Sequence, residues 1–143
     1  MRKFYMVLTG MIFLLSSCKK AEQYFDRDEE GILTGTAVVV KQGKLLSTLV
    51  PKLNNGVVKL YLRQDGKYVV ALEQINLYNT NDLAAYFSTG PSLPNLALKL
   101  FSFKNIPGNL YYEIPAGIDI SAAKFLLLQD DVHTLPVGTA ALQ

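Results

Sequence analysis

Short runs of alternating apolar and polar residues, broken by Gly, Pro or Asn, fill the chain from Gly31 onward. A period of two places successive side chains on opposite faces of a strand, and no window sustains the 3.6-residue period of an amphipathic helix. Repeated short strands with turn signals between them are typical of an all-β domain. We therefore expect an antiparallel β-sandwich of about eight to nine short strands, at residues 31–41, 44–50, 57–64, 67–74, 83–88, 97–103, 110–114, 124–128 and 137–142.

The clearest local signal is Asp65-Gly66, which lies between two alternating runs. Both residues tolerate positive φ, so the pair predicts a two-residue type I′ hairpin. In that register Leu62 lies opposite Val69, and Leu60 lies opposite Ala71.

Two other stretches refine the pattern. Gln42-Gly43 separates two apolar runs and predicts another turn. Leu126-Leu127-Leu128 is continuously apolar and too short for a helix, which predicts a strand buried on both faces.

The first seventeen residues read as a bacterial export signal. A positive start is followed by an apolar run, too short to span a bilayer, and then by Leu15, Ser16, Ser17 and Cys18. These four residues resemble the recognition site of the lipoprotein signal peptidase, which predicts cleavage before Cys18 and lipidation of its thiol. The alternative is a core helix that ends in a buried cysteine. We expect a signal peptide at 1–17, a lipidated cysteine and polar tether at 18–30, and one β-sandwich domain at 31–143.

The net charge of the chain without its predicted signal limits the kinds of binding partner. Without Arg2 and Lys3, which lie in the signal, 12 basic residues face 12 acidic ones. A neutral chain gives no electrostatic reason to bind nucleic acid. The expected partners are the lipid bilayer, through acylated Cys18, and an envelope protein or glycan. The location is the bacterial cell envelope, and Lys19 after the cysteine favours the outer membrane.

The residue inventory excludes several kinds of chemistry. Cys18 is the only cysteine, His133 is the only histidine, and all three methionines lie in the predicted signal. This chain alone therefore cannot supply the ligands of a His/Met haem or of a Cys/His zinc site, so no cofactor and no metal are expected. Asp130, Asp131 and His133 form the one polar cluster that suggests a catalytic or metal site. A polar loop between two strands is the preferred interpretation.

Several segments, in order, resemble the DM-thirteen electron-transfer domain, a small extracytoplasmic β-domain family. The resemblance spans about Gly31 to Leu142 and is carried by Gly35-Thr36-Ala37, Ala71 to Ile75, Asn79 to Ser88, Gly108 to Pro115 with Asp119-Ile120, and Gly138 to Leu142. It implies a β-sandwich and a redox role centred on a cysteine. The position that matches this cysteine holds Gln129, which makes the chain a divergent member.

Glutamine neither binds metal as a thiolate does nor cycles between thiol and disulfide. We therefore expect a lipid-anchored, non-enzymatic binding or structural accessory module. The alternative, drawn from the resemblance, is an electron-transfer or redox accessory domain. A third and weaker alternative is a hydrolase that uses His133 with Asp130 or Asp131.

Overall fold

The computed structural model describes residues 23–24, 36–49, 54–77, 82–93, 97–104 and 108–143, and every regular element among them is a strand. The predicted signal and lipidation site therefore lie outside the described residues, as do residues 31–35 of the first expected strand. The strands are β1 (Gln23–Tyr24), β2 (Ala37–Ser47), β3 (Asn54–Arg63), β4 (Tyr68–Ile75), β5 (Leu83–Ser88), β6 (Leu98–Phe103), β7 (Gly108–Glu113), β8 (Phe125–Asp130) and β9 (Pro136–Ala141).

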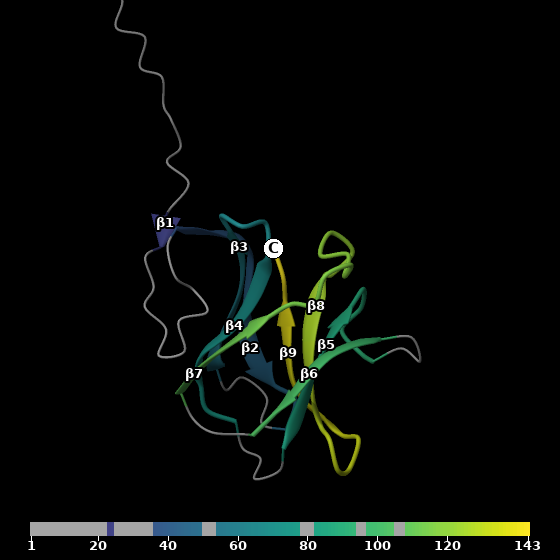
Figure 1. Ribbon diagram of the computed structural model, residues 1–143. Helices are drawn as coiled ribbons and strands as arrows, with labels where there is room; N and C mark the ends of the chain where they lie inside the picture. The colour runs from purple at the N-terminus through teal and green to yellow at the C-terminus, as the bar shows by residue number, and fades with distance from the viewer. Residues whose placement is uncertain (1–22, 25–35, 50–53, 78–81, 94–96, 105–107) are drawn as a thin grey trace, which may run out of the picture.

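All pairings are antiparallel and join the strands into one sheet in the order β6-β5-β8-β9-β2-β3-β4-β7, with β1 paired to β2. The predicted all-β antiparallel class is confirmed. The two-sheet sandwich is not confirmed, because the long strand β2 pairs with β3 along its length and with β9 near its end. The sheet is therefore continuous and curls around its core (Figure 1).

The prediction of a turn at Gln42-Gly43 is wrong, because β2 continues through these two residues. At this point β2 meets the end of the chain. The Gln42 N–H donates to the Gln143 carbonyl at 2.9 Å, and the Gln143 N–H donates to the Gln42 carbonyl at 3.0 Å. A Cβ on Gly43 would lie 2.0 Å from the Ala141 carbonyl oxygen. The glycine therefore permits a close approach of two backbones and does not form a turn.

The hairpin between β3 and β4 exists, but its predicted register is wrong by one residue. Leu62 lies opposite Tyr68, and Leu60 lies opposite Val70. The Arg63 N–H donates to the Lys67 carbonyl, and the Gly66 N–H donates to the Arg63 carbonyl, which leaves three residues in the loop. Gly66 has a φ of +80° and Asp65 does not share a positive φ, which fits a three-residue loop in place of a type I′ turn.

The concave face of the sheet holds the main core. It takes buried side chains from both halves of the sheet, including Leu45, Leu60, Leu72, Leu83, Leu126 and Leu128. Leu127 is also buried, so the prediction of a strand buried on both faces is confirmed for β8. A second cluster lies on the opposite face of β2, β3, β4 and β7, and it contains Ala37, Tyr61, Val69, Ala71 and Tyr111.

The two ends of the sheet, β6 and β7, meet through aromatic rings. The rings of Phe101 and Tyr112 stack with centroids 3.9 Å apart and an interplanar angle of 14°. The centroid of the Phe103 ring lies 5.8 Å from that of Phe101 and 6.2 Å from that of Tyr112. Neither strand pairs with the other within the described residues, so side chains join the edges of the sheet there. We call this junction the seam.

Candidate functional site

The predicted polar cluster divides into two parts in the structure. Asp130 is buried and lies at the end of β8, where its carboxylate organises the loop to β9. The backbone N–H groups of Val132 and His133 donate to its Oδ1 at 2.8 and 2.9 Å, and Nδ1 of His133 lies 3.1 Å from its Oδ2. The loop also holds Thr134 at a φ of +57°, which is rare for a β-branched residue. Asp130 and His133 therefore shape a loop.

Asp131 faces a different strand. Its carboxylate accepts hydrogen bonds from the Lys99 ammonium at 3.0 Å and from the Ser102 hydroxyl at 2.9 Å, both on β6. These donors lower the pKa of Asp131 from its ordinary value of 3.8, with Lys99 making the larger contribution. Asp131 thus fastens the edge strand β6 to the loop and does not converge with His133.

Gln129 lies within β8, opposite Ala84 of β5 and Pro136 of β9. Its side chain is half-buried. Because side chains alternate along a strand, it lies on the face opposite to Leu128, which belongs to the main core. Gln129 therefore does not point into the interior that the curled sheet encloses.

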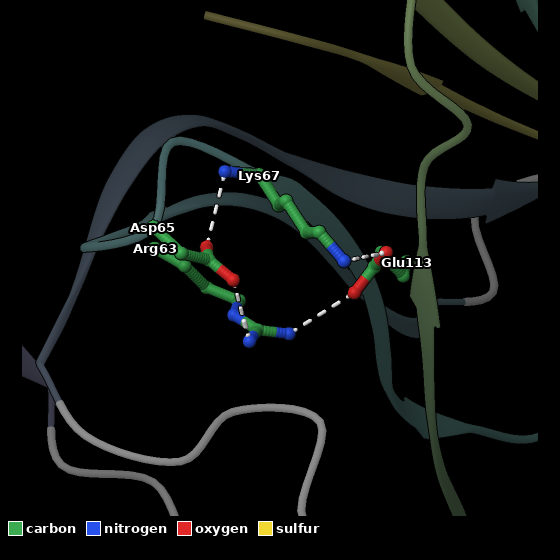
Figure 2. Close-up of polar contacts among 4 residues, drawn as sticks. All are labelled: Arg63, Asp65, Lys67 and Glu113. Carbon is green, nitrogen blue, oxygen red and sulfur yellow. Dashed lines mark hydrogen bonds and ion pairs between the residues drawn. The ribbon is translucent and has the colours of Figure 1, made fainter.

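Charged side chains gather at the β3–β4 hairpin and the end of β7 (Figure 2). The Arg63 guanidinium donates to Glu113 at 3.1 Å and to Asp65 at 2.8 Å, and the Lys67 ammonium donates to Glu113 at 2.7 Å. Two cations and two anions balance, so the group forms no basic patch. Exposed pairs of this kind contribute little stability, and their main effect is to join the hairpin to the edge strand β7.

Lys41 occupies a position that the sequence pattern does not reveal. It lies on β2, and its ammonium donates to the backbone carbonyls of Ile120, Ser121 and Ala123 at 3.0, 3.2 and 2.6 Å. These three acceptors satisfy all three donors of the ammonium. The lysine therefore fixes the segment that leads from β7 to β8 against the rim of the sheet.

A cavity of about 440 Å³ opens between this fixed segment and the start of β6, near Leu98 on the strand that also carries the seam residue Phe101. Sequence reasoning missed it, because its walls come from three separate parts of the chain. They include Phe87, Ser88, Leu98, Asp119, Ala122 and Ala123. We call it the seam cavity.

The carboxylate of Asp119 is the charged group of the seam cavity. The hydroxyl and the backbone N–H of Ser121 donate to its Oδ1 at 2.6 and 2.9 Å. These hydrogen bonds, the hydroxyl first, lower the pKa of Asp119 from its ordinary value of 3.8. Asp119 is therefore ionised at neutral pH.

A second cavity, of about 510 Å³, lies along β2 and the end of β9. Its walls include Gln42, Lys44, Leu46, Val57 and Ala141. Its walls combine polar side chains with the apolar Leu46, Val57 and Ala141, and none of its residues belongs to the main core. The seam cavity, in contrast, reaches a core residue, Phe87.

No group of three His, Cys, Asp or Glu side chains is placed to hold a metal ion in the described part of the chain. Within those same residues there is also no helix with the length and apolar character needed to cross a membrane. Comparisons of the chain with protein-family models, with curated proteins and with solved structures find no match.

Proposed function

We propose that the protein is a lipid-anchored, non-enzymatic β-domain of the bacterial cell envelope that acts as a binding module. The observation that carries the proposal is the seam cavity. Its volume of about 440 Å³ falls within the range of ligand pockets, and its walls are mainly apolar with one ionised carboxylate. Apolar walls with few polar groups are typical of sites that bind a small molecule.

The geometry around His133 supports a role without catalysis. A catalytic histidine needs a substrate or a nucleophile within hydrogen-bond reach of its ring. The nearby Thr134 hydroxyl instead donates to the carbonyl of His133 at 2.7 Å. Asp130, which would orient the ring, also accepts two backbone N–H groups of the loop. These contacts are consistent with a structural role for Asp130 and His133 in the loop between β8 and β9.

The anchor rests on Leu15, Ser16, Ser17 and Cys18. In this proposal the acylated Cys18 holds the domain at a membrane, and we propose that this is the outer membrane. The partner is a small ligand, an envelope protein or a glycan. Stable attachment needs about two acyl chains, which a lipidated N-terminal cysteine provides.

Metabolic palmitate labelling tests the anchor. We expect Cys18→Ser to abolish labelling and to yield unprocessed or soluble protein. Ser17→Gly, which keeps a small residue before the cysteine, is the matched control and should label normally. Labelling that persists in Cys18→Ser would overturn the lipoprotein proposal.

The electron-transfer alternative, drawn from the resemblance, predicts a preserved redox pocket at Gln129. We propose Gln129→Cys to separate it from the binding module. Because the side chain lies half-buried on the face opposite the core, we expect an ordinary thiol with a pKa near about 8.5 and no tight uptake of copper or haem. A thiol with a much lower pKa, or stoichiometric metal uptake, would favour electron transfer.

A further inference from the structure

The seam cavity lies between the β5–β6 end of the sheet and the segment that holds Asp119, Ala122 and Ala123. Phe87 and Leu98 are paired across β5 and β6, and paired residues lie on the same face of a sheet. Phe87 belongs to the main core and is 5% exposed. Leu98 therefore faces the same interior, yet it is 45% exposed. The Phe101–Tyr112 stack lies further along β6, and neither ring lines the cavity.

The cavity lining contains one charged residue, the exposed Asp119. Asp119 lies at the cavity wall, and two donors from Ser121 hold its Oδ1 in place. The ammonium of Lys41 is bound to the carbonyl groups of Ile120, Ser121 and Ala123, and its charge makes a smaller contribution to the lowered pKa of Asp119. Among the described residues, no ion pair joins a cationic side chain to Asp119, whereas Asp65 and Asp131 each have one.

We propose that the seam cavity binds a small organic cation with an apolar body, of the alkylammonium or arylalkylammonium class. The ammonium donates to the Asp119 carboxylate, and the apolar body packs against Phe87, Leu98 and Ala123. This inference rests on the proposed binding function and names the chemical class of its ligand. The apolar walls explain why an apolar body is needed, and the fixed carboxylate explains why the head group is cationic.

The ammonium group and the apolar body of the ligand contribute to binding in different ways. An exposed ion pair alone is weak, because water solvates both charges well. Burial of the apolar body against Leu98 and Phe87 removes surface from water and supplies affinity in proportion to the area covered. The carboxylate then selects the cation over a neutral or anionic compound of the same shape, because charge complementarity acts mainly on specificity.

The test uses the ¹⁵N-labelled full chain in detergent micelles and three probes of nearly the same shape: 2-phenylethylammonium, 2-phenylethanol and 3-phenylpropionate. We expect the ammonium probe to cause saturable amide shifts at Leu98, Ala122 and Ala123. The alcohol should bind several-fold more weakly, which is the effect of one exposed ion pair, and the carboxylate probe should not bind.

Two variants and one control locate the site. Asp119→Asn keeps an oxygen that accepts from Ser121, and we expect it to weaken ammonium binding several-fold. Leu98→Ala removes an exposed apolar wall without opening the core and should weaken binding several-fold. Asp65→Asn, which changes an exposed carboxylate on the β3–β4 hairpin, should leave binding unchanged. The amide spectrum of each variant reports whether it folds.

Two outcomes would overturn the inference. Equal binding of the ammonium and the alcohol would show that Asp119 does not select the ligand, although the cavity would still be a binding site. Ammonium-induced shifts that avoid the cavity amides, or no shifts at all, would show that the cavity takes no organic cation. The first outcome leaves the proposed binding function standing, and a cavity that responds to none of the three probes removes its main support.

Discussion

At the scale of single residues, two hairpin loops each contain a residue at positive φ, and a buried carboxylate holds one of the two loops. Gly66 and Thr134 lie at positive φ in two of the hairpin loops, one before β4 and the other before β9. Glycine adopts this conformation without strain, whereas threonine needs the surrounding contacts to hold it there. In the second loop those contacts come from Asp130. The first loop therefore depends on a glycine, whereas the second depends on the contacts of a buried aspartate.

We predict that Gly66→Ala lowers the free energy of unfolding by about 1–2 kcal/mol, which is the strain of an L-residue in the left-handed region. A Cβ at this position meets nothing within 4 Å, so backbone strain alone accounts for the loss. Gly66→Asn is the control and should lose less, because asparagine tolerates positive φ. Denaturant midpoints measure both. Equal midpoints for all three proteins would contradict the turn geometry.

The second residue-scale prediction compares Asp130 with His133. Asp130→Ala removes a buried carboxylate and leaves the backbone N–H groups of Val132 and His133 without this acceptor, and we expect a loss of about 2–3 kcal/mol. His133→Ala removes a side chain that is 60% exposed and should cost less than about 1 kcal/mol. Chemical denaturation distinguishes them. A larger loss for His133→Ala would show that the histidine, and not the carboxylate, holds the loop.

At the scale of strands, the edges of the sheet are held by different means. Edge strand β6 is fastened to the β8–β9 loop through Asp131, and edge strand β7 is joined to the β3–β4 hairpin through Glu113. In the middle of the sheet, β2 and the end of the chain meet through backbone hydrogen bonds at Gln42. Polar side chains protect the edges, and close backbone packing holds the centre.

We predict that the contribution of Asp131 to stability depends on pH. Its pKa is lowered in the folded state, so the unfolded chain takes up the proton first as the pH falls. The stabilisation is thus fully present above about pH 4 and is lost as the pH falls through the folded pKa. Asp131→Asn lacks this ionisation. The difference in denaturation midpoint between the two proteins should shrink below about pH 4, and a constant difference down to pH 2 would contradict the prediction.

The centre of the sheet is tested at Gly43. We expect Gly43→Ala to lower the free energy of unfolding by about 2–3 kcal/mol, because its Cβ would collide with the Ala141 carbonyl and push β9 away from β2. Gly90→Ala is the matched control. No atom lies within 4 Å of a Cβ there, so stability should stay the same or rise by up to about 1 kcal/mol. A tolerated Gly43→Ala would show that the close approach is not required.

At the scale of the whole molecule, sequence patterns predict the strands but not how the sheet continues or curls. Alternation is a local property, so β4 to β9 fall close to their predicted positions. The role of Gly43 depends on Ala141, nearly a hundred residues away, and no local pattern contains that contact. The seam cavity has the same origin, because Leu98 and Asp119 form no motif. In contrast, Asp130 and His133 are close in sequence, and their contact could be anticipated.

The last prediction concerns closure of the curled sheet. If the rings of Phe101 and Tyr112 join its two ends, their contributions to stability must be coupled, since no backbone hydrogen bond between β6 and β7 is described there. Each half-buried ring replaced by alanine should cost about 2–3 kcal/mol. The double-mutant cycle of Phe101→Ala and Tyr112→Ala should give a coupling energy of about 0.5–1.5 kcal/mol, as for other aromatic pairs.

Hydrogen exchange adds a spatial test of the same contact. Loss of either ring should speed amide exchange in both edge strands, because each strand would lose the partner that covers it, while β3 and β4 keep their protection. Phe87→Leu is a useful control, since it changes the core under β5 and leaves the stacked pair in place. A coupling energy near zero, or faster exchange confined to the mutated strand, would mean that the ends of the sheet only lie near each other. Loss of exchange protection in both β6 and β7 would instead mean that the two side chains hold together the sheet ends that no backbone hydrogen bond joins.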